Sequence, residues 1–293
     1  MKIAVITYDN KGAYASNEVN EDVLVDKLLG ELALDFSFEI WSDPNVNWKD
    51  YSLLLIKSPW DYFDRYAEFR TWCQKIQELD IPTLNAMDTV LWNSDKWYLK
   101  DIQDKGFPIV PTHFLKKKET FNLEEYFKIF NSDTLVIKPT VSGGAKKTLK
   151  LKQSNRKEYE EEIKAWLEEE DFMIQPFMDE VAKTGEYSYI FFNSRFSHAV
   201  LKSPKKGEFR VQHFFGGEIH SIAPTERELG YMQQIVDAFA QGTLYARVDG
   251  VWKEEVFYLM ELELIEPYLF LFTSEKAQEN YKKAIADKIK KLH

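Results

Sequence analysis

The pattern of apolar and polar residues changes its period repeatedly over the first 85 residues. Short apolar runs, which predict buried strands, alternate with stretches whose apolar residues recur three or four positions apart, as on one face of a helix. The predicted strands are 2–8, 37–41, 52–57 and 81–84, and the predicted helices are 17–33 and 65–79. Strands that alternate with helices in this way indicate a parallel sheet in an α/β arrangement.

The rest of the chain is richer in strands and predicts an α+β arrangement. Helices are predicted at 86–104, 156–170, 225–241 and 275–292, and Gly106 is a plausible C-cap for the first of them. Strands are predicted at 107–115, 135–140, 148–152, 172–177, 187–193, 197–202, 209–215, 218–222, 244–252 and 257–264. Prolines within 107–115 place that strand at a sheet edge or a bulge.

The last two of these strands adjoin in the sequence and predict a hairpin with an unusual polar face. Side chains two apart on a strand share a face, so Arg247 and Asp249 project together, as do Glu261 and Glu263. Three carboxylates and a guanidinium in an apolar hairpin are costly unless something pairs them. One explanation is an internal ion pair between Arg247 and Glu261. The other is a site for Mg²⁺, which takes carboxylate oxygens as ligands.

Composition excludes several classes of protein. Of 293 residues, 44% are hydrophobic, which suffices for a core, and 15% aromatic content argues against disorder. The single cysteine, Cys73, excludes an internal disulfide and indicates a reducing compartment. The net charge of −10 argues against nucleic acid as a partner. With neither a signal peptide nor a spanning segment in the sequence, we expect a cytoplasmic protein that does not enter a membrane.

A lysine and a glycine-rich segment follow one another near the middle of the chain. Lys138 closes the predicted strand 135–140, and the segment 141–147 reads VSGGAKK. A Ser-Gly-Gly turn presents backbone N–H groups with little side-chain hindrance, which suits phosphate oxygens, although many such turns are only turns. The segment is not a Walker motif, which opens a helix. A partly buried lysine at the strand end needs an anion, and this favours phosphate binding.

A second polar segment, KSPWDY, ends the predicted strand 52–57. Ligands of open α/β sheets bind at the carboxyl ends of strands. Ser58, Trp60, Asp61 and Arg65 are therefore candidates to face a small polar substrate. The alternative is a strand-to-helix turn with an acidic residue near the helix N-terminus. No Gly-x-Gly-x-x-Gly follows the first strand, so a dinucleotide fingerprint is absent.

Taken together, these motifs resemble those of the ATP-grasp superfamily. The segments KSPWDYFDRYAEFRTW, KPTVSGGAKKT and LMELELIEP resemble its cyclo-ligase branch, which forms D-cycloserine and lies close to bacterial glutathione synthetases. The segment KKGEFRVQHFFGG resembles the ligases that add glutamate to ribosomal protein. The motifs that occur in the family's order are Lys96, Lys138, the Gly-rich segment, Gln175-Pro176-Phe177, Arg210, Asp249 and Glu261-x-Glu263.

The resemblance implies a fold and a set of domains. In the ATP-grasp fold two α+β subdomains close on ATP, and a Rossmann-like lobe precedes them. Residues 1–88 are expected to form that lobe. Residues 89–175 would form the first subdomain, with the lysines and the Gly-rich loop, and residues 176–293 the second, with the carboxylate hairpin.

The resemblance also implies roles for individual side chains. Phosphates would be bound by Lys96, Lys138 and the loop residues Ser142, Gly143, Gly144 and Ala145, with Lys202 as a further nucleotide-binding candidate. Adenine would be read near Gln175, Pro176 and Phe177, and the ribose by Glu186 or Glu180. Asp249, Glu261 and Glu263 would hold two Mg²⁺ ions, with Mn²⁺ as an alternative. Arg210 and Arg247 would stabilise negative charge as it develops.

The implied activity is an ATP- and Mg²⁺-dependent ligase that joins a small carboxylate to an amine, or cyclises an amino-acid-like substrate, through an acyl phosphate. Phosphoryl transfer needs positioning and charge stabilisation and no covalent nucleophile. Two alternatives are a phosphotransferase on the same fold and a non-catalytic ATP-binding protein. Retention of the lysines, arginines and carboxylates counts against the second. Homodimers are common among similar proteins. The chain departs from many relatives at Glu263, where they carry Asn, and at Tyr268, where glycine is expected after the proline.

Overall fold

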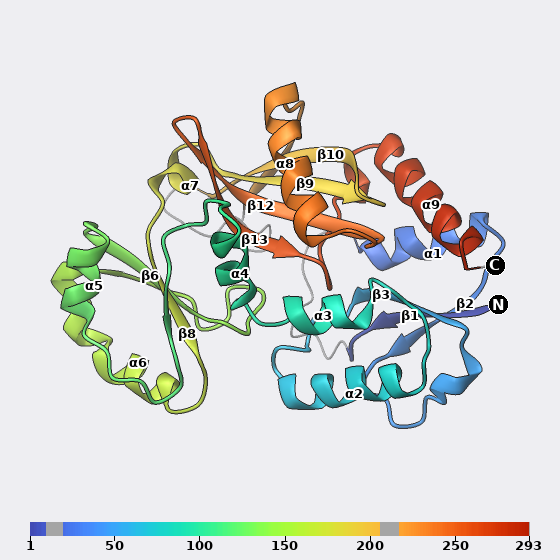
Figure 1. Ribbon diagram of the computed structural model, residues 1–293, viewed down its shortest axis with the longest axis horizontal. Coiled ribbons are helices and arrows are strands. Elements are labelled where there is room, and N and C mark those ends of the chain that lie inside the picture. Colours follow the sequence, from blue (N-terminus) through green and yellow to red (C-terminus); the bar gives the residue numbers. More distant parts are fainter. Residues whose placement is uncertain (10–19, 206–216, 293) are drawn as a thin grey trace.

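The computed structural model describes residues 1–9, 20–205 and 217–292. These residues form three sheets that follow one another along the chain. In Figure 1 the first sheet lies at the lower right, the second at the left and the third above both. The predicted combination of an α/β lobe with an α+β remainder is confirmed.

The first sheet is parallel, with the strand order β2-β1-β3-β4. Its core strand β3 is buried at every position, as the unbroken run LLLIK predicts. The predicted helix 17–33 begins, within the described residues, at Glu21, because the Asn20 side chain caps it by accepting the Asp22 N–H. The elements are β1 (Lys2–Thr7), α1 (Glu21–Glu31), β2 (Asp35–Ile40), η1 (Trp48–Asp50), β3 (Leu53–Ser58), α2 (Tyr66–Glu78) and β4 (Thr83–Leu84).

The second sheet is antiparallel, with the order β5-β8-β6-β7, and two helices pack against it around one apolar core. The predicted strand 107–115 is shorter than expected, because Ile109 and Val110 pair instead with Leu259 of the third sheet. The predicted helix 156–170 is a 3-10 turn followed by a shorter helix. The elements are β5 (His113–Leu115), α5 (Leu123–Ile129), β6 (Thr134–Pro139), β7 (Leu149–Lys152), η2 (Gln153–Glu158), α6 (Glu160–Leu167) and β8 (Phe172–Pro176).

The single helix predicted at 86–104 is wrong: the chain forms α3 (Met87–Asn93) and α4 (Tyr98–Asp104), with a break between them. Tertiary hydrogen bonds account for the break, since the Lys96 N–H donates to the Thr140 carbonyl at 2.8 Å. The side chain of Asn93, the last residue of α3, also bonds the backbone of Leu262 and Leu264 at the end of the last strand. Gly106, with φ of +90°, ends the second helix as predicted.

The third sheet has the order β11-β10-β9-β12-β13, and its neighbouring strands are antiparallel. Thr225 and Glu228 form a capping box that starts its helix α8. The predicted strand 209–215, with Arg210, lies outside the described residues. The elements are α7 (Asp179–Lys183), β9 (Glu186–Phe192), β10 (Arg195–Ser203), β11 (Glu218–Ile222), α8 (Glu226–Phe239), β12 (Tyr245–Lys253), β13 (Val256–Glu263), η4 (Leu271–Thr273) and α9 (Glu275–Lys290).

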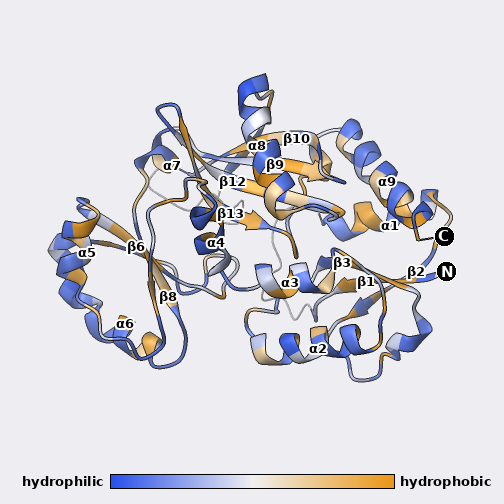
Figure 2. Cartoon of the chain, viewed as in Figure 1, coloured by the Kyte–Doolittle hydropathy of each residue, from blue (hydrophilic) through white to orange (hydrophobic). Residues whose placement is uncertain are grey.

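The first and third sheets share an apolar core. Residues of β1 and β3 pack in one cluster with residues of β9, β12 and α9, and α1 lies beside α9 (Figure 1). Figure 2 shows hydrophobic colouring along the strands of the third sheet, whereas α2 and α9 are largely hydrophilic on the side seen. None of the helices in the described part of the chain combines the length and the apolar character needed to span a membrane.

Candidate nucleotide and metal site

The predicted hairpin is confirmed, and its register brings the polar side chains together. Arg247 of β12 lies opposite Glu263 of β13, and Asp249 lies opposite Glu261. The register shifts between Asp249 and Gly250, and the residue left over at this shift, Met260, lies on β13. The four side chains share one face because the strands alternate as the sequence predicts. Together with four side chains from neighbouring strands and loops (Lys96, Lys138, Glu186 and Lys202) they form what we call the hairpin cluster.

Arg247 is the most highly coordinated side chain of the cluster. Its Nε and Nη2 donate to the Asp249 carboxylate at 2.8–3.0 Å, and Nη2 also donates to Glu263. Nη1 donates to the Tyr268 carbonyl at 2.9 Å, and the guanidinium lies 5.5 Å from the centroid of the Phe270 ring. Burial would lower the pKa of Arg247, but the carboxylates of Asp249 and Glu263 raise it. The guanidinium is therefore held charged in one orientation.

Asp249 is almost inaccessible to solvent and saturated with donors. Its carboxylate accepts from Ser188 at 2.6 Å and from Arg247, and Lys202 lies 3.4 Å away. Burial alone would raise the pKa of Asp249, but Arg247 and Lys202 lower it to about 2. Asp249 is thus ionised at neutral pH.

Glu261 is held by lysines. Its Oε1 accepts from Lys138 Nζ at 3.1 Å and lies 4.0 Å from Lys96 Nζ. Lys96 also donates to the Ser142 carbonyl at 2.6 Å. Burial would raise the pKa of Glu261, but the two lysines lower it. The ion pair between Arg247 and Glu261, one of the two explanations drawn from the sequence, is wrong. Arg247 pairs with Asp249 and Glu263 instead.

A second carboxylate–lysine pair completes the cluster. Lys202 of β10 donates to Glu186 of β9 at 2.6 Å, and Lys202 is 7% exposed. Burial raises the pKa of Glu186 in spite of the lysine. Of the two ribose candidates, the structure thus brings Glu186 into the cluster. Glu180 lies on α7, where its backbone carbonyl ends the helix, and among the described residues its side chain has no hydrogen bond to the cluster.

Two carboxyl groups near the end of the hairpin have strongly raised pKa values. Burial raises the pKa of Glu263 to about 7, and Asp249 and Glu261 add to this despite Arg247. Burial and Glu263 raise the pKa of the nearby Glu266 to about 8. Burial is the largest cause of both raised pKa values. A divalent cation bound beside these carboxyl groups would favour their ionised forms.

The carboxylates of the hairpin cluster are candidate ligands for a metal ion. Within the ranges that the structure describes, no three His, Cys, Asp or Glu side chains are gathered as a ready metal cluster. The carboxylates are instead turned toward the cations that surround them. One oxygen each of Glu261 and Glu263 nevertheless has no hydrogen-bond partner among the described residues, and both side chains are partly exposed. The donor set, carboxylate oxygens on rigid strands, therefore fits Mg²⁺.

The predicted adenine-binding residues lie at the end of β8. Gln175 donates to the Thr112 hydroxyl at 2.8 Å, and the Phe177 N–H donates to the Thr134 carbonyl at 2.9 Å. Lys150 Nζ lies 3.4 Å from the centroid of the Phe177 ring. Pro176 pairs with β6, the strand that carries Lys138. Pro176 lies opposite Leu135, three positions before Lys138 on that strand, and the Phe177 N–H is used within the protein.

The Gly-rich loop lies against the first lobe. An ideal Cβ on Gly143 would come within 2.3 Å of the Phe63 ring, so this close approach requires glycine. Gly144 and Ala145 both have positive φ, and Lys146 of the loop forms an ion pair with Asp64. The loop therefore bridges the hairpin cluster, through Lys96 and Ser142, and the segment that follows β3.

The predicted substrate residues divide into two groups. Trp60 Nε1 donates to the Glu266 carbonyl at 3.0 Å, so it lies against the chain just after the hairpin. Ser58 bonds the carboxylate of Asp22 at 2.9 Å, in the first lobe. Asp61 accepts from the Trp41 indole and Arg65 lies 4.0 Å from Asp61, so both are held by neighbours in their own lobe. Trp60 alone of the four contacts the hairpin end.

Several residues near the site were not predicted. Glu21 and Lys57 form a buried ion pair, and Glu266 closes the end of the hairpin. A lysine inside an otherwise apolar strand was the available signal for Lys57, because a buried ammonium must have a partner. Glu21 gave no such signal, since an acidic residue at the start of a helix needs no tertiary explanation.

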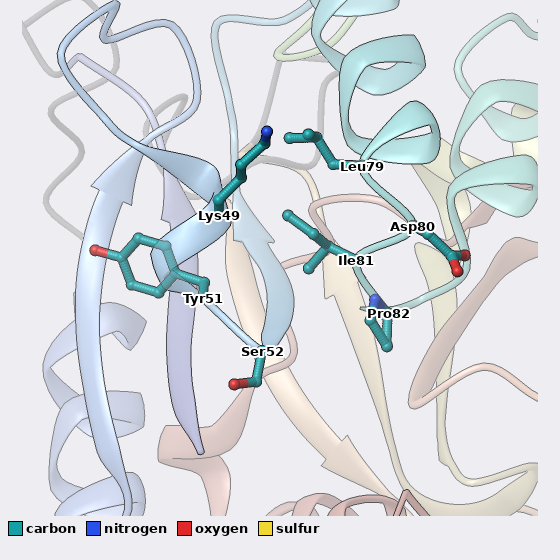
Figure 3. Close-up of a pocket in the computed structure, with 7 residues that line it drawn as sticks. All are labelled: Lys49, Tyr51, Ser52, Leu79, Asp80, Ile81 and Pro82. Carbon is teal, nitrogen blue, oxygen red and sulfur yellow. The ribbon is translucent and has the colours of Figure 1, made fainter.

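A separate groove lies at the amino-terminal ends of strands in the first sheet, away from the hairpin cluster. Figure 3 shows the side chains that line it, which come from the amino ends of β3 and β4 and from the end of α2: Lys49, Tyr51, Ser52, Leu79, Asp80, Ile81 and Pro82. Ligands of parallel sheets bind at the carboxyl ends of the strands, where Ser58 and Trp60 lie. The groove carries none of the predicted site residues.

Two protein-family models match successive parts of the chain. Residues 3–85 match the N-terminal domain of D-cycloserine synthetase DcsG, and residues 103–267, more than half of the chain, match the ATP-grasp domain of prokaryotic glutathione synthetase. The second match covers the Gly-rich loop, both ribose candidates and the whole hairpin.

Individual proteins are similar over nearly the whole chain. The cycloserine biosynthesis protein DcsG of Streptomyces lavendulae is 26% identical over 271 residues, which cover 85% of this chain and 87% of that protein. A crystal structure of D-cycloserine synthetase DcsG superposes with a TM-score of 0.86 at 22% identity, covering 99% of this chain and 100% of that one. D-alanine–D-alanine ligase from Bacillus anthracis in complex with ATP gives 0.69 at 19% identity, with 99% and 96% covered. These likenesses confirm the predicted ATP-grasp fold.

Proposed function

The chain belongs to the family of the prokaryotic glutathione synthetase ATP-grasp domain, an ATP-grasp ligase family, and from this premise we propose a specific reaction for it. As a member of this family it is an ATP-dependent enzyme that joins a carboxylate to an amine. We propose that the ligation proceeds through an acyl phosphate and acts on a small amino-acid-like molecule, with two substrates or with one that cyclises.

The observation that carries the proposal is the convergence of cations and carboxylates from three parts of the chain. Lys138 comes from β6, Lys96 from the break between α3 and α4, and Arg247, with its carboxylates, from the hairpin. ATP brings four negative charges to such a place together with Mg²⁺. Lysines that now bind Glu261 can bind phosphate oxygens when a metal ion takes over the carboxylate.

The first step moves the γ-phosphoryl group from ATP to the substrate carboxylate, which gives ADP and an acyl phosphate. In the second step the amine attacks the acyl carbon, the C–O bond to phosphate breaks, and the amine loses a proton. Phosphoryl transfer is mostly positioning and charge stabilisation, for which Lys96 and Lys138 are placed. Arg247 would stabilise the oxyanion that forms as the amine attacks.

Mg²⁺ would supply charge neutralisation at the phosphates. Asp249, Glu261 and Glu263 are the residues that would hold it, with the partly exposed Glu261 and Glu263 offering oxygens. Two ions, or Mn²⁺ in place of Mg²⁺, are part of the proposal. The proposal also includes binding of adenine by Gln175–Phe177 and of the ribose by Glu186. Arg210, the second proposed oxyanion ligand, lies outside the described residues.

The substrate is proposed to lie between the Gly-rich loop and the end of β3. Trp60 and Ser58 are the side chains there, and Trp60 contacts the chain next to the hairpin. The relatives named for cycloserine and D-alanine–D-alanine support a small amino-acid-like molecule. We propose no nucleic-acid or membrane partner; a homodimer is a further part of the proposal.

The test is phosphate release from ATP and Mg²⁺ in the presence of amino acids, ureido-amino acids and short peptides. A pair of compounds that jointly stimulates release supports a two-substrate ligase, and a single compound whose product is cyclic by mass supports cyclisation. A phosphorylated product that persists in the presence of amines would instead establish a phosphotransferase. ATP binding without turnover in any combination would contradict the proposal.

A further inference from the structure

A buried ion pair in the first lobe holds the chain that follows the hairpin. Glu21, from the first turn of α1, and Lys57, from β3, lie 3.1 Å apart, and each is 1% exposed. A buried pair of this kind is weak evidence for stability, because desolvating both charges offsets most of their attraction. The partners that the two side chains take are therefore informative.

Both members of the pair bond the backbone of residues 266–271, which we call the post-hairpin segment. The Glu21 carboxylate accepts the N–H groups of Leu269 and Leu271, each at 2.8 Å. Lys57 Nζ lies 3.4 Å from the Pro267 carbonyl and donates to it. The segment before Leu271 has no helix or strand of its own. Its buried backbone groups therefore depend on such side chains for their hydrogen bonds.

The post-hairpin segment in turn holds Arg247. The Tyr268 carbonyl accepts from Arg247 Nη1 at 2.9 Å, and the Phe270 ring lies under the guanidinium. Tyr268 lies between Pro267 and Leu269, whose backbone groups form hydrogen bonds with Lys57 and Glu21. Phe270, with φ of +53°, stands between Leu269 and Leu271, the two whose N–H groups Glu21 accepts. The ion pair fixes the residues on either side of each Arg247 contact.

We propose that Glu21 and Lys57 are positioning residues for the ligase reaction: through the post-hairpin segment they set the orientation of the Arg247 guanidinium. They touch neither substrate nor nucleotide in this account. The inference rests on the proposed function, because the role of Arg247 at the oxyanion comes from there. Two side chains of the first lobe thereby control the orientation of a guanidinium in the third sheet that is distant from both in the sequence.

The test begins with Glu21→Gln, which keeps the shape of the side chain but removes its charge. We expect kcat to fall by about tenfold or more, as misplacement of a catalytic group does, while the KM for ATP stays within about twofold. Because this variant leaves a buried ammonium unpaired, Glu21→Gln/Lys57→Met removes both charges and is expected to fold and to show the same loss. Unchanged kcat in both variants would overturn the inference.

Val25→Ala is the matched control. Val25 lies one turn further along α1, is fully buried in the same apolar core, and bears no group that can bond the post-hairpin segment. It is expected to lower the melting temperature but not kcat. If Val25→Ala lowers kcat in proportion to stability as Glu21→Gln does, the ion pair is merely structural.

A double-mutant cycle with Arg247→Lys shows whether the pair acts through Arg247. In the Arg247→Lys background Glu21→Gln should add little further loss of kcat, because the guanidinium that Glu21 orients is already absent. If the two variants lower kcat independently, so that their fold-losses multiply, the proposed link from the ion pair to Arg247 is overturned while the proposed ligase function stands. A wild-type rate in Arg247→Lys itself would overturn the role of Arg247 and the proposed link with it.

Hydrogen exchange at the Leu269 and Leu271 amides provides a readout that does not need activity. Both should exchange faster in Glu21→Gln and unchanged in Val25→Ala. Unaltered exchange in Glu21→Gln would contradict the inference even if the ligase proposal holds. Faster exchange in an enzyme without ligase activity would separate failure of the proposed function from failure of the structural link.

Discussion

Two groups of buried charge lie close to the same stretch of chain and differ in balance. Glu21 and Lys57 match one carboxylate with one ammonium, and each finds its further partners in backbone groups. In the hairpin cluster the carboxyl groups, counted with Glu266, outnumber the lysines and Arg247, and two of them have strongly raised pKa values. We infer that the pair holds the protein in shape, whereas the hairpin cluster binds a ligand from outside.

The largest effect that tests this contrast is expected from Glu261→Gln. Glu261 joins the two lysines to the proposed metal site, so ATP turnover should fall on the order of 10³-fold while the fold stays intact. Phosphate release in the presence of Mg²⁺ and circular dichroism measure the two parts. Glu255→Gln, at the exposed turn of the same hairpin, is the control. Full activity of Glu261→Gln would rule out the role given to Glu261.

The next largest effect is expected from Arg247→Lys, which keeps the positive charge but removes the planar guanidinium. A lysine cannot bond Asp249, Glu263 and the Tyr268 carbonyl together. We expect kcat to fall about 10²-fold with the KM for ATP little changed, measured by steady-state kinetics. A loss confined to KM would show that Arg247 binds the ground state only.

Gly143→Ala tests whether the Gly-rich loop must lie against the first lobe. The added methyl would meet the Phe63 ring, so turnover should fall by about tenfold through a displaced loop. In Gly143→Ala/Phe63→Ala the ring is gone, and part of the rate should return. If the double variant is no better than Gly143→Ala alone, the contact with Phe63 is not what requires glycine at this position.

The smallest effect concerns stability as a function of pH. The pKa of Glu263 is raised to about 7 in the folded state, so the proton that it binds stabilises the fold below the ordinary glutamate pKa. This contribution is lost as pH rises through about 7. Without Mg²⁺ the free energy of unfolding should therefore decline by on the order of 2 kcal/mol between about pH 4.5 and 8. Glu266, with its pKa near 8, acts in the same direction.

Urea unfolding at several pH values measures this decline, and Glu263→Gln should reduce it. Addition of Mg²⁺ should also reduce it, because the metal ion favours the ionised carboxylate. Asp249 has the opposite sign, since its pKa is lowered to about 2, and its contribution is lost only below about pH 4. Equal slopes in wild type and Glu263→Gln would contradict the assignment.

Much of the fold followed from the sequence because strands and helices have distinct periods. Alternation alone predicted that Arg247 and Asp249 share a face, and the register confirms it. The break at Lys96 could not be predicted, because it depends on a hydrogen bond to Thr140, which is distant in the sequence. Local helix preference carries no trace of such a contact.

The pairing of side chains within the site could not be predicted from the sequence either. One of the two explanations drawn from the sequence paired Arg247 with Glu261, but the register places Glu263 opposite Arg247. A shift of two residues would keep the same face and place Glu261 opposite Arg247, and side-chain types do not fix the register when acidic residues alternate along the strand. Glu21 was missed because only the fold brings α1 to the post-hairpin segment. The roles of the proposed ATP and metal ligands remain predictions.

Above all, we propose that the carboxylates of the hairpin cluster bind Mg²⁺ together with the nucleotide. Calorimetric titration with ADP, with and without Mg²⁺, tests it directly in wild type and in Glu261→Gln/Glu263→Gln. We predict that Mg²⁺ strengthens ADP binding by about tenfold or more in wild type and has little effect in the double variant. An equal Mg²⁺ effect in both proteins would contradict the account.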